Sequence, residues 1–204
     1  MKLWHCRDAR SLRPLWTLEE MGLQYEIEVL PFPPRVLAKE YLSVNPLGTV
    51  PYFVDGPTHM TESTGICHYL VERYRRHDFG LATDDPEYGA YLNWLYQSDA
   101  TLTFPQTIYL RYARLEPVER RLPQAADDYR KWYLARLRML DAHLVDHDYL
   151  CGGRFTIADI AIGYALFLGS TLGFAADYQP QTRGYFERLC ERAAFRRARA
   201  IGAR

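Results

Sequence analysis

The sequence lacks most of the features that mark secreted, membrane-spanning or nucleic-acid-binding proteins. It has four cysteines and no Cys-x-x-Cys pair in 204 residues, so we expect reduced thiols, as in the cytosol, rather than a disulfide framework. Its 25 basic and 25 acidic residues cancel, which gives no electrostatic reason to expect nucleic acid or a membrane surface as a partner. It has no apolar run of about 18 residues and no long apolar stretch near Met1, so we expect neither a membrane span nor a signal peptide. The expected location is cytoplasmic.

What is present is ordinary for a globular chain. Hydrophobic residues make up 48% of the sequence and charged residues 25%, and the length suits one large domain or two small ones. The segment from His77 to Pro86 combines a glycine with a run of polar turn residues, which is typical of a linker. We therefore expect a first domain at residues 1–78 and a second domain at 86–204.

Strand and helix signals alternate in the first domain. Lys2–His5 and the alternating residues 25–29 have strand patterns, and Ser11 is a good N-cap residue for the amphipathic helix that ends before Gly22. A short helix at about 35–43, a hairpin and a further helix follow. This order of elements is that of an α/β thioredoxin-like fold.

The second domain has only helical patterns, which predicts an all-α domain. Pro105 should kink or break a long helix. Residues 129–145 form one amphipathic pattern. Thr156 and Asp159 have the spacing of a capping box at the start of the most apolar stretch, which we expect to form the spine of the domain.

The stretch from Asn45 to Leu70 has the pattern of a binding site for an extended, peptide-like ligand. Pro51 interrupts strand pairing, so the backbone before it can offer a free N–H and C=O. A helix that starts near Glu62 and Ser63 offers free N–H groups to a carboxylate, and Glu62 can hold an ammonium group. Glutathione has both ends and a peptide bond between them. A plain hairpin followed by an ordinary capped helix is the alternative.

Three motifs in this chain resemble cytosolic glutathione transferases of the bacterial type. They are SLRPLWTLEEMGLQYE, NPLGTVPYFVDG followed by ESTGI, and YLCGGRFTIADI, and they occur in the family's order over nearly the whole chain. The resemblance is to the serine and cysteine branches rather than the tyrosine branch. It implies a thioredoxin-like domain followed by an all-α domain, with a cis-proline at Pro51 and the substrate site in the cleft between the domains. It also implies a homodimer that uses glutathione as co-substrate and no metal, and that acts in detoxification.

The resemblance implies that the glutathione thiolate is activated in the loop before the first helix. Ser11 combines a hydroxyl group with a position at a helix N-terminus, and both features favour a thiolate. Its alternative role is a plain N-cap. Arg10 stands where the bacterial branch carries its catalytic cysteine, which argues against mixed-disulfide chemistry. Arg10 can stabilise a thiolate electrostatically, or it can be a solvated loop residue.

The resemblance also implies positions for both substrates. The expected glutathione-binding residues are Thr49, Val50, Pro51, Glu62, Ser63 and Asp99. Val50 would pair through its backbone, and Asp99 would reach the glutathione of the partner subunit. The expected pocket for a small hydrophobic electrophile is lined by Phe104, Tyr109 and Tyr112, although aromatics at helical spacing can equally be core residues.

Two other functions remain open from the sequence. The fold can serve a non-catalytic glutathione-binding or protein-interaction protein, since a fold does not fix a function. Cys6 can make the chain a thiol-disulfide or peroxide-reducing enzyme, although it lacks the Cys-Pro-Tyr or Cys-Pro-Phe setting of such enzymes. His143 and His147 are four residues apart, but without an HExxH motif we expect no metal.

Overall fold

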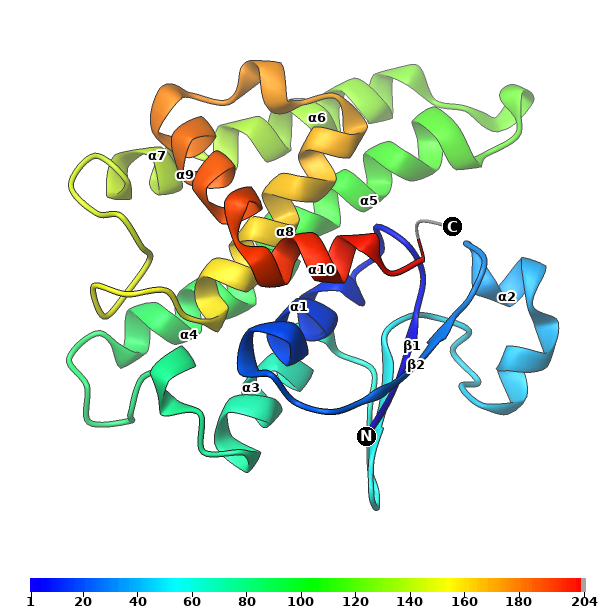
Figure 1. The fold of residues 1–204 in the computed structure, drawn as a ribbon. Coiled ribbons are helices and arrows are strands. Elements are labelled where there is room, and N and C mark those ends of the chain that lie inside the picture. Colours follow the sequence, from blue (N-terminus) through cyan, green and yellow to red (C-terminus); the bar gives the residue numbers. More distant parts are fainter. Residues whose placement is uncertain (203–204) are drawn as a thin grey trace. The chain divides into compact units, whose positions relative to one another are not determined.

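The structure is a computed structural model, and it describes residues 1–202 (Figure 1). The chain divides into two compact units. The first unit comprises Met1–Gly80 and returns at Cys190 to include the C-terminal segment, and the second unit is Leu81–Leu189. The chain therefore enters and leaves the second unit once, and its last helix belongs to the first unit. The sequence pattern had assigned that helix to the domain at 86–204.

The first unit contains a four-stranded mixed sheet with helices on it, as the sequence predicts. Its strands are β1 (Lys2–His5), β2 (Glu26–Val29), β3 (Tyr52–Asp55) and β4 (Thr58–Met60). Its helices are α1 (Leu12–Met21), α2 (Pro34–Leu37), the 3-10 turns η1 (Lys39–Ser43) and η2 (His77–Phe79), α3 (Ser63–Arg73) and α10 (Ala193–Ala200). The strand order is β2-β1-β3-β4, in which only β1 and β2 are parallel. This is the thioredoxin-like arrangement.

The strand period of two separates the two faces of this sheet. Leu3 of β1 and its cross-strand partner Phe53 of β3 are fully buried, on the face opposite to Trp4. Trp4 packs instead with Ala38 and Tyr41 from the α2–η1 segment. Helices α1 and α3 pack against each other, and both carry apolar, fully buried side chains. This packing on both faces holds β1 and β3 in place, and it therefore also holds the ends of the β1–α1 loop and of the segment before β3.

Helix α10 is fastened to α1 by rings and by charges. The rings of Trp16 and Phe195 lie 4.7 Å apart. Arg192 makes two hydrogen bonds to the Glu20 carboxylate, from Nε at 2.6 Å and from Nη2 at 2.8 Å. The Trp16 ring N–H donates to the same carboxylate at 2.9 Å. A fork of this kind fixes geometry as well as charge.

The second unit is helical in the part of the chain that the structure describes, in agreement with the all-α prediction. Its main helices are α4 (Tyr88–Gln97), α5 (Phe104–Leu110), α6 (Pro123–Arg136), α7 (Arg138–His143), α8 (Ile157–Leu172) and α9 (Pro180–Glu191). Its shorter turns are η3 (Ser98–Thr103), η4 (Arg111–Leu115), η5 (Val118–Arg120) and η6 (Ala175–Asp177). The pattern at 129–145 is divided between α6 and α7, where the sequence predicted one helix.

Helix α8 is the spine of this unit, and its capping box is confirmed. The Thr156 hydroxyl accepts the Ala158 N–H at 3.2 Å, and the Thr156 N–H donates to the Asp159 carboxylate at 2.8 Å. Asp159 also accepts hydrogen bonds from the Leu150 N–H and the Tyr185 hydroxyl. Burial nevertheless raises the pKa of Asp159 to about 6, because desolvation outweighs these bonds.

Pro105 does not end the helix, because helical turns continue on both sides of it from Ser98 to Leu115. The helix widens into the π-helical turns η3 before it and η4 after it. A proline has no N–H, so the ordinary helical ladder is interrupted there. The Thr103 hydroxyl donates to the Ser98 carbonyl at 2.6 Å and so satisfies one carbonyl within the wide turn. Such π-turns absorb an interruption without ending the helix.

Candidate functional site

The segment before β3 presents a strand-like edge. The Val50–Pro51 peptide bond is cis, as the resemblance implies. The Thr49 carbonyl accepts hydrogen bonds from Asn45 Nδ2 at 2.9 Å and from the Tyr41 hydroxyl at 2.8 Å, so the loop is held firmly one residue earlier. Within residues 1–202 no hydrogen bond uses the N–H or C=O of Val50. Val50 can therefore pair with the backbone of an extended ligand.

Gly48 allows the loop to take this path. Its φ is +61°, in the left-handed region that favours glycine. A Cβ at this position would lie 2.7 Å from Arg35 Cβ and 2.9 Å from a methyl group of Leu42. A side chain here would push the loop away from the α2–η1 segment. Steric hindrance by Arg35 and Leu42 thus explains why a glycine occupies position 48 in the NPLGTVP motif.

The N-terminus of α3 forms a positively polarised corner. Glu62 is its exposed N-cap residue, in an extended conformation, and no acidic residue follows in the first turn. Ser63 is buried, and its hydroxyl accepts a hydrogen bond from Arg13 Nη1 at 3.0 Å. The guanidinium of Arg13 is itself fully buried. The N-terminus of a helix with a positive charge behind it suits a carboxylate, and exposed Glu62 suits an ammonium group.

Arg13 is a site residue that the sequence did not reveal. It lies on the buried face of α1, among Leu12, Leu15 and Trp16, where an apolar residue would be expected. The sequence signal is an arginine on the apolar stripe of an amphipathic helix. A charged residue is fully buried only when it is paired, so such a position points to a polar partner on a neighbouring element.

Ser11 lies deep inside the first unit. Its hydroxyl oxygen accepts the Cys6 N–H at 3.2 Å and lies 2.8 Å from His5 Nδ1 in a second hydrogen bond. Burial lowers the pKa of His5 from 6.5 to about 4, so this imidazole is neutral at neutral pH. Ser11 is the N-cap residue of α1, as the sequence predicts, but it has helical backbone angles and its side chain makes no capping hydrogen bond. Its hydroxyl joins the end of β1 to the start of α1.

Arg10 is the more accessible of the two expected catalytic residues. It is partly exposed in the turn that leads into α1, two residues after Asp8. Asp8 has a φ of +59°, a left-handed conformation that is unusual outside glycine. Unusual backbone conformations of this kind often cluster at functional sites. The loop therefore leaves part of Arg10 accessible, whereas the Ser11 hydroxyl is buried.

Cys6 is a poor nucleophile in this structure. It is fully buried, and its Sγ lies 3.6 Å from the Pro31 carbonyl in a weak hydrogen bond. Burial raises the pKa of its thiol to about 12. The thiolate is the reactive form of cysteine, and this thiol remains protonated at neutral pH. The geometry thus gives no support to the thiol-disulfide alternative.

The expected residues of the second unit do not form a single cluster. Tyr109 and Tyr112 line one cavity of about 380 Å³ between α5 and α6. Phe104 is half exposed and packs edge-on against Tyr129, with ring centres 6.3 Å apart, and it does not line that cavity. Asp99 lies half-buried in the π-turn η3. The structure therefore brings together two of the three expected pocket aromatics.

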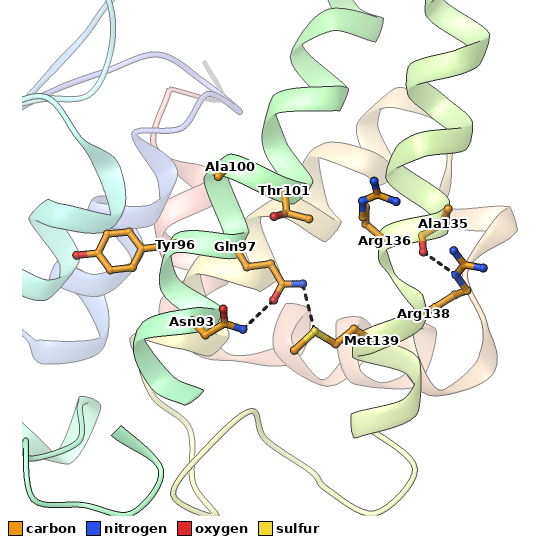
Figure 2. A pocket seen from close by; sticks show the side chains of 9 residues that line it. All are labelled: Asn93, Tyr96, Gln97, Ala100, Thr101, Ala135, Arg136, Arg138 and Met139. Carbon is orange, nitrogen blue, oxygen red and sulfur yellow. Dashed lines mark hydrogen bonds between the residues drawn. The ribbon is translucent and has the colours of Figure 1, made fainter. Parts of the chain in front are cut away.

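A second cavity of about 600 Å³ lies between α4 and the α6–α7 pair (Figure 2). Gln97 and Met139 face each other across it, and Gln97 Nε2 lies 3.8 Å from Met139 Sδ. Tyr96 at its edge is 65% exposed, and Met139 is 49% exposed. This combination leaves apolar surface on α4 and α7 in contact with solvent.

Residues 1–202 contain no group of three or more His, Cys, Asp or Glu side chains placed to hold a metal ion. His143 and His147 stack with ring centres 4.2 Å apart, so their nitrogens do not converge on one point. His143 Nε2 and His147 Nδ1 are both bonded to backbone carbonyls. Within the same residues no helix has the length and apolar content needed to cross a membrane.

Comparison with known proteins identifies the family. The family model for the glutathione S-transferase N-terminal domain matches residues 1–72, and the model for the C-terminal domain matches residues 105–193. The chain belongs to the glutathione S-transferase family. Glutathione S-transferase 2 of Schizosaccharomyces pombe is 32% identical over 177 residues, which cover 83% of this chain and 75% of that protein.

Solved structures of this family share the fold over the whole chain. A ternary complex of BphK, a bacterial glutathione S-transferase, has a TM-score of 0.87 at 23% identity and covers 100% of both chains. The glutathione transferase URE2P6 of Phanerochaete chrysosporium, in complex with oxidised glutathione, has a TM-score of 0.84 at 26% identity and covers 99% of this chain and 96% of that chain. Val50 and the N-terminus of α3 both lie within residues 1–72, the part of the chain that the N-terminal family model matches.

Proposed function

We propose that this glutathione S-transferase family member binds glutathione in its first unit and transfers the thiolate to a small hydrophobic electrophile. The proposal rests on two features that occur together in the first unit. The backbone N–H and C=O of Val50 are not used in hydrogen bonds within residues 1–202, and the loop before them is held by the Asn45 side chain. The second feature is the N-terminus of α3. These two features match the peptide bond and the charged γ-glutamyl end of glutathione. Membership of the family supports the same ligand.

Each expected glutathione-binding residue of the first unit has a specific task in this proposal. The Val50 N–H and C=O pair with the cysteinyl residue, and Pro51 holds that backbone turned toward the ligand. Ser63 and the first-turn N–H groups of α3 bind the γ-glutamyl carboxylate, and Glu62 binds the ammonium group. Thr49 has an exposed side chain beside the bound peptide.

The β1–α1 loop lowers the pKa of the glutathione thiol in this proposal. The partly exposed guanidinium of Arg10 and the N-terminus of α1 both favour the negative sulfur. The hydrogen bonds of the Ser11 hydroxyl to Cys6 and His5 hold the loop in place behind them. The thiol proton passes to solvent, the thiolate electron pair forms a carbon–sulfur bond with the electrophile, and the leaving group of the electrophile departs with the electron pair of the bond that breaks.

Calorimetry of glutathione binding, followed by absorbance titration of the bound thiolate, tests both steps. Wild type is expected to bind glutathione and to lower its thiol pKa, and Arg10→Ala should restore much of the ordinary value. Arg7→Ala is the matched control, because Arg7 is an exposed arginine of the same loop. Ser11→Ala separates a direct role from a positioning one: a positioning role predicts a loss of stability together with the loss of thiolate. An unchanged thiol pKa in wild type would remove the catalytic proposal.

A second candidate is a glutathione-binding protein without transferase activity. The observation that favours it is the complete burial of Ser11, which removes the expected hydroxyl donor from the ligand. This candidate predicts normal glutathione binding, no shift of the thiol pKa and no turnover with a chlorodinitrobenzene electrophile. The experiment above therefore distinguishes the two.

We also propose that the protein is a cytoplasmic homodimer that acts in detoxification. The half-exposed Met139, which faces Gln97 across the larger cavity, supports a subunit interface on α4 and α7 (Figure 2). Asp99 follows α4 directly and would reach the glutathione of the partner subunit. Light scattering should give twice the chain mass, and Met139→Glu should lower it toward one chain. Val118→Glu, at an exposed apolar position on η5, is the control.

A further inference from the structure

The smaller cavity of the second unit has the dimensions of a ligand pocket. It lies between α5–η4 and the beginning of α6, and the two helices run side by side (Figure 1). Its volume of about 380 Å³ falls in the range of pockets for small molecules. Ala126 of α6, which is almost fully buried, is one of the residues that line it. We name this cavity the α5–α6 pocket.

Two aromatic rings form one wall of the α5–α6 pocket. Tyr109 and Tyr112 are one helical turn apart, and both are half-buried. The ring of Tyr109 is held edge-on against Phe174, with ring centres 4.7 Å apart and an angle of 77° between the planes. A ring fixed in this way loses little further freedom when a ligand contacts it. Aromatic surfaces of this kind favour a flat aromatic ligand.

The opposite side of the pocket carries a net positive charge. Arg121 and Arg130 line it, against a single aspartate, Asp127. Asp127 is neutralised by Lys131 at 2.6 Å, and Arg130 by Asp177 at 2.5 Å. Among the charged residues that line the pocket, Arg121 is therefore the one whose charge is not offset by such an ion pair within residues 1–202.

Arg121 is also placed to receive an anion. Its Nε donates to the Glu116 carbonyl at 3.2 Å, which anchors the guanidinium at the pocket. Within residues 1–202 no carboxylate forms an ion pair with it. A guanidinium held by one nitrogen still offers donors in a planar fork, which suits a carboxylate.

We infer that the α5–α6 pocket binds an aromatic carboxylate. The ring of the ligand lies against Tyr109 and Tyr112, and its carboxylate pairs with Arg121. Arg130 adds a second positive group whose charge is already shared with Asp177. The inference concerns residues of the second unit alone, and it holds whether or not the first unit activates glutathione.

Titration calorimetry of the full chain with 2-naphthoate, in the absence of glutathione, tests this inference. The neutral control ligand is 2-naphthylmethanol, which has the same rings without the charge. Arg121→Gln removes the proposed partner of the carboxylate. The matched control is Arg120→Gln, which removes the same charge from the neighbouring residue, outside the pocket lining. Circular dichroism confirms that each variant remains folded.

We expect 2-naphthoate to bind to wild type about threefold more tightly than the neutral alcohol, and Arg121→Gln to remove about that factor, the size of one ion pair at an exposed arginine. Arg120→Gln should bind as wild type does. Tyr112→Leu should weaken the carboxylate and the alcohol alike. Equal losses of 2-naphthoate affinity in Arg121→Gln and Arg120→Gln would mean that only the overall positive charge of the region matters, and this would overturn the proposal. Equal affinity of wild type for 2-naphthoate and 2-naphthylmethanol would also overturn it. Absence of binding to wild type would overturn it outright.

Discussion

The buried His5 makes the stability of the protein depend on pH in a direction that can be worked out in advance. Burial holds its folded pKa at about 4, against an ordinary value of 6.5. Below pH 6.5 the unfolded chain takes up a proton at this residue that the folded chain does not accept until about pH 4. The folded state is therefore favoured above pH 6.5, and this contribution is lost as the pH falls toward 4.

The magnitude follows from the two pKa values. At about 1.36 kcal/mol for each pH unit, the difference between 6.5 and about 4 amounts to about 3 kcal/mol in total. About 2 kcal/mol of that should be lost between pH 7 and about pH 5. Other groups titrate in the same range, among them Asp159, whose pKa is raised to about 6 by burial and whose contribution has the opposite sign. A comparison with a variant is therefore needed.

Urea denaturation of wild type and His5→Asn at pH 7 and at about pH 5 isolates this contribution. Asparagine can keep a polar group near Nδ1 for the bond to Ser11, but it does not titrate. Wild type should lose about 2 kcal/mol more than the variant over this range. His59→Asn, a histidine exposed on β4, controls for the loss of a histidine as such. Parallel losses in wild type and His5→Asn would refute the reasoning.

Three further changes should affect stability for separate reasons. Gly169→Ala places a methyl group in overlap with the Tyr178 hydroxyl, so thermal unfolding should show a loss of about 2 to 3 kcal/mol, and an unchanged midpoint would contradict this packing. Thr156→Ala removes the side-chain cap of α8 and should cost about 1 to 2 kcal/mol in urea denaturation, whereas Thr156→Ser should restore most of it. Glu20→Gln weakens the fork to Arg192 and should cost about 1 kcal/mol at low salt; a cost that persists undiminished at high salt would show that the bond is not chiefly ionic.

Local patterns in the sequence predicted many of the helices, strands and caps of the structure. The alternation around Ile27, the glycine after α1 and the capping box of Thr156 and Asp159 each correspond to an observed feature. These signals are reliable because each depends on residues within a few positions of one another. The order of elements that they define was enough for the thioredoxin-like and all-α assignments.

Features that depend on distant contacts were not accessible in the same way. The buried Ser11 hydroxyl bonds to His5, on a strand that the helix pattern does not describe. The position of Arg13 under α3 requires Ser63, fifty residues further along the chain. The split at Leu137 and the wide turns around Pro105 depend on how neighbouring helices accept the interrupted ladder. No spacing rule within a single element contains this information.

The expected site residues differ in how far local sequence could place them. Val50 and Glu62 lie in one continuous motif, and the structure shows the backbone features that this motif predicted. Phe104, Tyr109 and Tyr112 were grouped by helical spacing, and the neighbouring helix decides which of them share a cavity. The charge of Arg121 at that cavity comes from a connection that has no periodicity.

The return of α10 to α1 also has a consequence for how the protein is made. A ribosome releases the sheet, α1 and α3 early, but the partner of Trp16 emerges only with Phe195, 179 residues further along the chain. Until then the nascent chain carries a tryptophan face with no cover. A chain that ends before Cys190 would lack Phe195 and Arg192 and would leave this face exposed. The cover of the Trp16 face thus depends on a segment that is made long after the rest of the first unit.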